Sequence, residues 1–224
     1  MRLLLIRHGQ TPANVRGSLD TAAPGPSLTE LGRTQAAAIP SALADEDIDG
    51  IYTSVLVRTQ QTAAPLARVR GEMHRVVLPG IHEIEAGELE GRTDEAAVRR
   101  YLEVVWAWGS GELDARMPGA GDGHDFYGRF DADIARIAGE QAEDATVAAF
   151  SHGAAIRVWT AARASNIPPE FPGRNHLENT GVVALEGAPA RGWIVTSWAG
   201  EPLGGLALED PTARDVTGEP LTGP

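Results

Sequence analysis

Apolar residues fall in short blocks separated by polar and glycine-rich segments, and the spacing within the blocks differs along the chain. Continuous apolar runs such as residues 3–6 and 147–150 are typical of strands that are buried on both faces of a sheet. On this pattern the chain is expected to contain six strands, at residues 3–6, 50–53, 75–78, 145–150, 182–185 and 193–198.

Helical spacing of apolar residues occurs between the predicted strands. Phe126, Phe130, Ile134 and Ile137 follow one another at intervals of three or four residues, which places them on one face of a helix. Similar spacing predicts further helices at residues 28–43, 55–67, 93–108 and 153–164.

Local signals suggest where these helices begin and end. Thr29 is the expected N-cap of the first helix, and Ser54 is the expected N-cap of the second. Pro40 is expected to kink or split the first helix, because proline lacks the amide hydrogen that a helix interior requires. Residues 109–123 are rich in glycine and are expected to form a loop.

Repeated alternation of strands and helices predicts an α/β fold with three layers, α/β/α, around a mainly parallel central sheet. Residues 1–209 are expected to form a single domain of this kind. Residues 210–224 are rich in proline, glycine and threonine and offer little to bury, so they are expected to form a flexible C-terminal tail.

The amino-acid composition excludes several types of catalytic group and metal site. The chain has 224 residues, its 19 basic residues are all arginine, and it has no cysteine. Without cysteine there is no thiolate nucleophile, disulfide, cysteine-based zinc site or iron–sulfur cluster. Without lysine there is no Schiff base and no lysine to complete a P-loop. An enzymatic nucleophile must therefore be a hydroxyl, an imidazole, a carboxylate or a bound water.

The acidic balance narrows the partners and the expected location. With 31 acidic and 19 basic residues, the formal net charge is −12. This charge argues against nucleic acid and against anionic membrane surfaces, both of which attract basic proteins. The N-terminal apolar run is too short for a signal peptide or a spanning helix. A cytoplasmic protein with no membrane partner is expected, and a homodimer stays open.

Polar clusters follow four of the predicted strands. They are Arg7-His8-Gly9 after the first, Ser54 with Arg58 after the second, Glu83 after the third, and Ser151-His152-Gly153 after the fourth. Because ligands bind beyond the carboxyl ends of parallel strands, these clusters are expected to converge on one edge of the sheet.

Residues of these types suit phosphoryl transfer. A neutral imidazole can attack phosphorus and form a covalent phosphohistidine. The planar guanidinium groups of Arg7 and Arg58 can each bind phosphate oxygens with two hydrogen bonds. Their positive charge also disfavours protonation of a nearby imidazole, which keeps the nucleophile available. The helix that follows Ser54 is expected to add backbone N–H donors for the anion.

An alkoxide leaving group requires a proton donor. Glu83 is the best placed glutamate in order along the chain. Glu85, Glu88 and Glu90 follow within seven residues, and a run of glutamates is usually a solvated loop, so the residues alone leave the choice open.

A metal site is the main competing interpretation. His8, His152 and a carboxylate could bind zinc. However, the chain has no closely spaced pair of histidines to begin such a site, and two arginines beside a cation would repel it. No metal is therefore expected.

Five sequence blocks, in order, resemble the histidine phosphatase superfamily, also called the phosphoglycerate mutase-like family. They are LIRHGQT at residues 5–11, LTELGRTQA at 28–36, SVLVRTQQTA at 54–63, EIEAGELEG at 83–91 and FSHGAAIR at 150–157. Asn14, six residues after His8, also matches the family's pattern. Together the blocks cover most of the chain.

The resemblance implies roles for individual residues. His8 is the implied phosphorylated nucleophile, Glu83 the proton donor and His152 a further catalytic residue. The phosphate pocket is implied to comprise Arg7, Asn14, Arg58 and His152, with Gly153 beside it. For phosphatase members the resemblance implies no metal and no dissociable organic cofactor.

Departures from the family pattern favour the phosphatase branch. Residues 118–124 replace the Pro-Gly-Gly-Glu-Ser block that many members carry, and the residues typical of glycolytic mutases are missing. The expected activity is metal-independent hydrolysis of a small phosphomonoester. Phosphoglycerate mutase activity is the first alternative, and a non-catalytic binder of phosphorylated ligands is the second.

Overall fold

Six strands form one mixed sheet in the computed structural model, which describes residues 1–218. Their order across the sheet is β3-β2-β4-β1-β5-β6. The strands are β1 (Arg2–Arg7), β2 (Ile48–Ser54), β3 (Arg75–Leu78), β4 (Thr146–Ser151), β5 (Val182–Ala188) and β6 (Gly192–Ala199). Strands β1 to β4 are parallel, whereas β5 is antiparallel to β1 and β6 is antiparallel to β5. The expected α/β fold with a mainly parallel sheet is confirmed.

Strand β1 shows why its sequence is continuously apolar. Its side chains alternate between the two faces of the sheet. Leu3 and Leu5 belong to the larger buried core, and Leu4 and Ile6 belong to the smaller core on the opposite face. Because both faces are covered by helices, residues 3–6 in the middle of the strand are all apolar.

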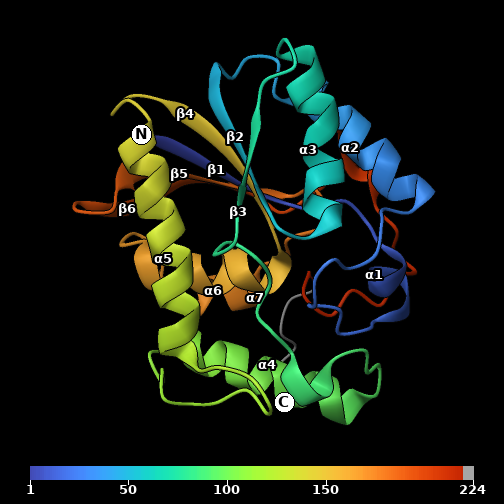
Figure 1. Cartoon of the computed structure of the whole chain (residues 1–224). Helices are drawn as coiled ribbons and strands as arrows, with labels where there is room; N and C mark the ends of the chain where they lie inside the picture. The colour runs from blue at the N-terminus through green and yellow to red at the C-terminus, as the bar shows by residue number, and fades with distance from the viewer. Residues whose placement is uncertain (219–224) are drawn as a thin grey trace.

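Helices cover the sheet on both faces (Figure 1). The pair α2 (Glu30–Ala42) and α3 (Val57–Val69) encloses the smaller core. Helices α4 (Glu95–Gly109), α5 (Gly123–Glu140) and α6 (Gly153–Arg163) enclose the larger one. Shorter helical segments are α1 (Pro12–Arg16), α7 (Phe171–Arg174) and the 3-10 turns η1 (Gly87–Leu89) and η2 (Leu206–Leu208).

Two of the expected helix details are wrong. Helix α2 continues through Pro40 without interruption, since the proline lies in its last turn. Helix α3 begins at Val57 with Leu56 as its N-cap, so Ser54 does not cap it. The Ser54 hydroxyl instead lies within hydrogen-bond distance of the His152 ring, and this contact draws Ser54 into the site.

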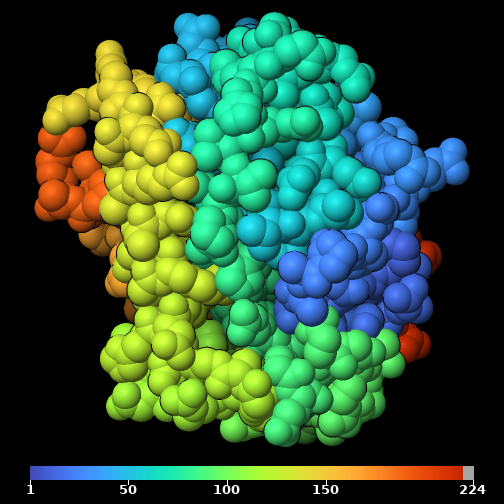
Figure 2. Space-filling view, in the orientation of Figure 1, coloured from blue at the N-terminus to red at the C-terminus, as the bar shows by residue number. Residues whose placement is uncertain are grey.

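Residues 210–218 pack against the body of the protein. The Arg214 amide donates to the Val15 carbonyl at the end of α1, and Asp215 is only 4% exposed. In Figure 2 the red atoms of the C-terminal region lie beside the blue atoms of the N-terminal region. Residues 219–224, which complete the tail expected from sequence, lie outside the described residues. No helix within residues 1–218 combines the length and apolarity needed to cross a membrane.

Candidate active site

The ends of adjacent parallel strands bring the sequence-predicted clusters together. Arg7 on β1 is paired in register with Ser151 on β4, and the His8 amide donates to the Ser151 carbonyl at 3.1 Å. Strand β2 lies on the other side of β4 and ends at Ser54. The loop after β3 adds Glu83 at the same edge. The predicted convergence at one edge of the sheet is therefore observed.

Close backbone packing explains two glycines of the sequence blocks. A Cβ atom on Gly32 would lie 2.1 Å from the Gln10 carbonyl oxygen, and one on Gly9 would lie 2.7 Å from the Gly32 carbonyl oxygen. Any larger residue at Gly32 would push α2 away from the loop after β1. The two glycines thus let α2 support the backbone that carries His8.

His8 is held as a neutral imidazole with one free nitrogen. Its Nδ1 lies 2.8 Å from the Gly9 carbonyl oxygen. A carbonyl only accepts hydrogen bonds, so Nδ1 carries the proton and the lone pair remains on Nε2. Burial lowers the pKa of His8 well below its usual value, and the charges of Arg58 and Arg7 lower it further. His8 therefore has the protonation state that nucleophilic attack requires.

His152 lies next to His8 at the start of α6. The two ring centroids are 5.2 Å apart, and the Nε2 atom of His152 is 2.8 Å from the Ser54 hydroxyl. Burial lowers the pKa of His152 well below its usual value, and Arg58 adds to this effect. When Ser54 donates to Nε2, the neutral ring carries its proton on Nδ1. That nitrogen has no hydrogen-bond partner within residues 1–218.

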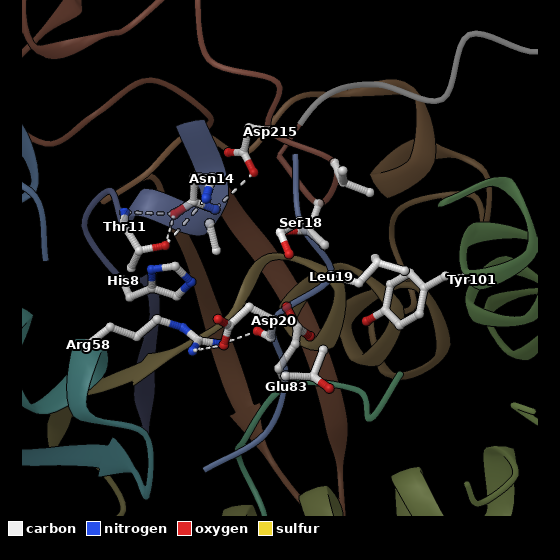
Figure 3. Close-up of a pocket in the computed structure, with 14 residues that line it drawn as sticks. His8, Thr11, Asn14, Ser18, Leu19, Asp20, Arg58, Glu83, Tyr101 and Asp215 are labelled. Atoms are coloured by element: carbon white, nitrogen blue, oxygen red, sulfur yellow. Dashed lines mark hydrogen bonds and ion pairs between the residues drawn. The ribbon is translucent and has the colours of Figure 1, made fainter. Parts of the chain in front are cut away.

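Arg58 extends from the first turn of α3 toward His8 (Figure 3). Its Nη2 donates to the Asp20 carbonyl at 3.0 Å, and its Nη1 is 3.6 Å from the Asp20 carboxylate. Burial lowers the pKa of Arg58, and nearby carboxylates, Glu83 first, oppose that effect. A guanidinium in this setting stays charged, because its ordinary pKa is far above neutral.

Glu83 is buried in the pocket wall at the N-terminus of α6. Its carboxylate accepts hydrogen bonds from the Ala155 amide at 2.9 Å and the Ala154 amide at 3.3 Å. The first amides of a helix have no partner within the helix, and here Glu83 supplies it. Arg129 also donates to the Glu83 carbonyl, which fixes the backbone of this residue. The carboxylate is thereby held in one orientation beside the pocket.

The structure separates Glu83 from the other glutamates of its run. Glu83 lines the pocket that contains His8, whereas Glu85 and Glu90 line a neighbouring cavity. Glu90 accepts hydrogen bonds from the backbone and hydroxyl of Thr21, and Glu88 is exposed. Its place in the pocket thus distinguishes Glu83 from the other three glutamates, which the sequence alone left as candidates for the proton donor.

Arg7 and Asn14 meet a residue that the sequence did not single out. Both Nη atoms of Arg7 contact the Asp215 carboxylate, at 2.5 and 2.6 Å. The Asn14 amide nitrogen donates to the same carboxylate at 3.1 Å. Gly153 lies close by, because a Cβ atom on it would be 3.0 Å from the Arg7 Nε atom. Asp215 stands in a loop-like segment without a motif, so no sequence signal marked it.

His8, Asn14, Arg58, Glu83 and Asp215 line one pocket that is partly open to solvent. Arg7, His152 and Gly153 lie behind these residues and do not line it. In Figure 3 the His8 ring lies between Arg58 and Asn14, with Glu83 and Asp20 across the pocket and Asp215 above Asn14. The pocket is lined by His8, Thr11, Ala13, Asn14, Ser18, Leu19, Asp20, Thr21, Arg58, Glu83, Tyr101, Asp215, Val216 and Thr217.

Several buried nitrogens of the site lack a hydrogen-bond partner within the described part of the chain. They are Arg7 Nε, Arg58 Nε, Arg58 Nη1 and His152 Nδ1. Buried polar groups are normally satisfied, and a cluster of unsatisfied donors in one place points to a missing acceptor. An anion at this position would supply that acceptor. Residues 1–218 contain no group of three or more His, Asp or Glu side chains arranged to hold a metal ion.

The sequence profile of the histidine phosphatase superfamily (branch 1) matches residues 3–199. The chain belongs to this superfamily. The resemblance expected from the five sequence blocks is therefore confirmed over nearly the whole chain.

Curated relatives of this chain align over different shares of their own length. The PE-PGRS family protein PE_PGRS11 of Mycobacterium tuberculosis is 39% identical over 225 residues, which cover 94% of this chain. The aligned part is only 38% of that longer protein. A metal-independent phosphoserine phosphatase of Arabidopsis thaliana is 26% identical over 156 residues, 69% of this chain and 65% of that protein.

Solved structures of superfamily phosphatases share the fold. Mycobacterial glucosyl-3-phosphoglycerate phosphatase, complexed with VO3, is 27% identical with a TM-score of 0.73, covering 88% of this chain and 98% of that one. A phosphoserine phosphatase mutant of Entamoeba histolytica, complexed with phosphoserine, is 26% identical with a TM-score of 0.70, covering 88% and 96%. These neighbours are phosphatases of small phosphorylated molecules.

Proposed function

We propose that this chain hydrolyses small phosphomonoesters through a covalent phosphohistidine on His8, without a metal ion or an organic cofactor. The observation that carries the proposal is the cluster of unsatisfied buried nitrogens on Arg7, Arg58 and His152 around the free nitrogen of a neutral His8. A phosphate group supplies acceptors for those donors and an electrophilic phosphorus for the nucleophile.

In the first step His8 Nε2 attacks phosphorus, and the bond from phosphorus to the leaving oxygen breaks. Glu83 enters this step as the carboxylic acid and gives its proton to that oxygen, and the alcohol leaves. The imidazole gains positive character as the new bond forms, and the Gly9 carbonyl that accepts from Nδ1 stabilises it. Arg58 stabilises the charge on the phosphoryl oxygens.

In the second step a water molecule attacks the phosphohistidine from the side that the alcohol has left. Glu83, now a carboxylate, takes a proton from the water, and the bond between His8 and phosphorus breaks. Inorganic phosphate leaves, and both residues return to their starting protonation states. Hydrogen bonds from Ala154 and Ala155 hold the Glu83 carboxylate in place for both proton transfers.

The proposal is tested with p-nitrophenyl phosphate in the presence of a chelator. We expect hydrolysis by the native chain and loss of hydrolysis in a His8→Ala variant. His124→Ala is the matched control, because His124 lies on the surface and is absent from the pocket. Rapid quenching with a labelled phosphoester is expected to trap an acid-labile phosphohistidine in the native chain.

Three outcomes would count against the proposal. Full activity of His8→Ala would remove the nucleophile from the mechanism. Faster transfer of the phosphoryl group between hydroxyls of a glycerate than to water would instead favour a phosphoglycerate mutase. If no phosphoester labels the folded chain, a non-catalytic binder becomes the better interpretation.

A further inference from the structure

The segment that contains Asp215 is anchored at several points beside the pocket. Thr217 accepts a hydrogen bond from Arg7 through its hydroxyl and another from Arg157 through its carbonyl. The Gly218 carbonyl accepts from the Leu177 amide at 2.9 Å. Asp215, Val216 and Thr217 all line the pocket that holds His8. This stretch of chain is therefore a wall of the site.

Asp215 and its neighbours supply acceptors for most of the hydrogen-bond donors of the Arg7 side chain. The guanidinium is completely buried. Its Nη1 donates to the Leu177 carbonyl and faces one oxygen of Asp215, and its Nη2 donates to the other oxygen and to Thr217. All four Nη hydrogens thus have an acceptor nearby. The remaining donor, Nε, has no hydrogen-bond partner within residues 1–218 and lies beside Gly153.

The same carboxylate also orients Asn14. Thr11 donates to the Asn14 side-chain oxygen through both its backbone amide and its hydroxyl, at 2.9 Å each. The amide nitrogen on the other side of Asn14 donates to Asp215. With both ends held, the Asn14 amide cannot flip without losing hydrogen bonds. Asp215 therefore fixes the orientation of Arg7 and Asn14, two residues that the superfamily pattern assigns to phosphate binding.

We propose that Asp215 is a positioning residue of the phosphate site: it clamps the Nη side of Arg7 and the amide of Asn14, and so fixes the orientation of both groups beside the pocket that contains His8. This inference rests on the proposed phosphatase function. A hydrogen bond from Nη2 to Oδ1 and a close ion contact between Nη1 and Oδ2 hold the guanidinium at two points rather than one.

A competing explanation is that Asp215 occupies the place of the substrate and must leave before phosphate binds. The two explanations predict opposite effects of removing the carboxylate. A clamp strengthens phosphate binding, so its loss weakens that binding. A competing anion weakens phosphate binding, so its loss strengthens it. Arg58 favours the clamp, because it lines the pocket with His8 and keeps Nε and Nη1 without a hydrogen-bond partner in residues 1–218 while Asp215 stays in place.

The experiment compares Asp215→Ala and Asp215→Asn with the native chain by three measurements. These are the inhibition constant of orthovanadate, the KM and kcat for p-nitrophenyl phosphate, and the melting temperature with and without vanadate. Asp210→Asn is the matched control, since it removes a carboxylate from the same segment that contacts Gln10 rather than Arg7.

We expect Asp215→Ala to weaken vanadate inhibition by about tenfold or more and to raise KM more than it lowers kcat, because misplaced binding groups cost affinity. Asp215→Asn keeps one acceptor oxygen for Arg7 and Asn14, so a smaller loss is expected. The asparagine variant also keeps the test decisive if the alanine variant does not fold.

Vanadate inhibition that is unchanged or tighter in folded Asp215 variants would overturn this inference while leaving the proposed function intact. Absence of both hydrolysis and vanadate inhibition in the native chain would overturn the proposed function itself. Loss of vanadate affinity in Asp210→Asn equal to that in Asp215→Asn would show a general effect of charge and also reject the clamp.

Discussion

The Arg7 guanidinium and the Asp215 carboxylate form a buried ion pair, with 2.5 Å between Nη1 and Oδ2, although 208 residues separate them in sequence. Burial alone would lower the pKa of Arg7, but the charge of Asp215 and its hydrogen bond outweigh burial and raise it. The pair thus ties a segment near the C-terminus to the end of the first strand.

Breaking this pair is expected to be costly for folding. An Asp215→Ala variant leaves a buried charge without its partner, which typically costs about 3–5 kcal/mol. Replacing both residues, as in Arg7→Met with Asp215→Leu, also removes the buried charge. This double variant is expected to lose less free energy of unfolding than Asp215→Ala. Urea unfolding of the three proteins measures these free energies. An equal or larger loss in the double variant would contradict this account of the pair.

Acid is expected to destabilise the fold through His8 and His152. Burial depresses the pKa of both in the folded state, so the unfolded chain takes up protons first as the pH falls. This contribution is complete above the unfolded value of about 6.5 and is lost as the pH falls toward the folded-state pKa. The free energy of unfolding is therefore expected to fall as the pH is lowered from 7.5 to 5.5, and each histidine contributes to that fall.

Urea unfolding at several pH values measures this dependence. A His8→Asn variant has no imidazole at that position, so its free energy of unfolding is expected to fall less steeply below pH 6.5 than that of the native chain. Equal slopes in the two proteins would show that His8 does not remain neutral when buried.

The sequence predicted the sheet edge and its residues because their signals are local. A buried strand that ends in Arg7 and His8 marks its own position, and the parallel arrangement then brings His152 to the same edge. The choice of Glu83 rested on the superfamily resemblance, since periodicity does not distinguish neighbouring glutamates. In the structure burial and contact with the first turn of α6 distinguish it.

Asp215 could not be predicted in the same way. Its role depends on where a distant strand end lies, and the residues around it are those of an ordinary loop. Ser54 failed as a helix cap for a related reason. Capping propensity is a local preference, whereas the Ser54 hydroxyl contacts His152, which follows strand β4, and β4 is adjacent to β2 only in the folded sheet. Long-range contacts override the local pattern in both cases.

A Glu83→Gln variant is expected to separate substrates by their leaving group. Glutamine keeps an acceptor oxygen for the Ala155 amide but cannot donate the proton that an alkoxide needs. Hydrolysis of an alkyl phosphate should fall by about 10²–10⁴. Hydrolysis of p-nitrophenyl phosphate should fall less in its first step, because a nitrophenolate leaves without protonation. Formation of the phosphohistidine, followed in single-turnover experiments, measures this step.

Equal loss of phosphohistidine formation with both substrates would place Glu83 outside the proton transfer. Circular dichroism of the variant serves as the structural control, since Glu83 also satisfies the first amides of α6. Glu88→Gln, which changes an exposed carboxylate of the same run, is expected to leave both rates unchanged.

A cavity beside the pocket that contains His8 is expected to bind the alcohol part of the substrate. A second cavity meets the His8 pocket at Thr21, which lines both. Its described lining contains Glu85 and Glu90 but no arginine. His82 also lines it, and burial lowers the pKa of His82, with Arg129 lowering it further, so this ring is neutral near pH 7. An alcohol that carries a carboxylate would meet two carboxylates and no arginine on the described lining of this cavity.

Phosphoethanolamine is therefore expected to be a better substrate than phosphoserine, from which it differs only by the missing carboxylate. A close pair of like charges near the surface costs about 1 kcal/mol or more, so a ratio of kcat/KM of about 5 to 10 is expected. Glu85→Arg should reduce or reverse this ratio by placing a positive charge on the cavity wall, whereas Glu88→Arg should leave it nearly unchanged, because Glu88 does not line the cavity. Preference of the native chain for phosphoserine, or equal effects of the two arginine variants, would show that the alcohol part binds elsewhere.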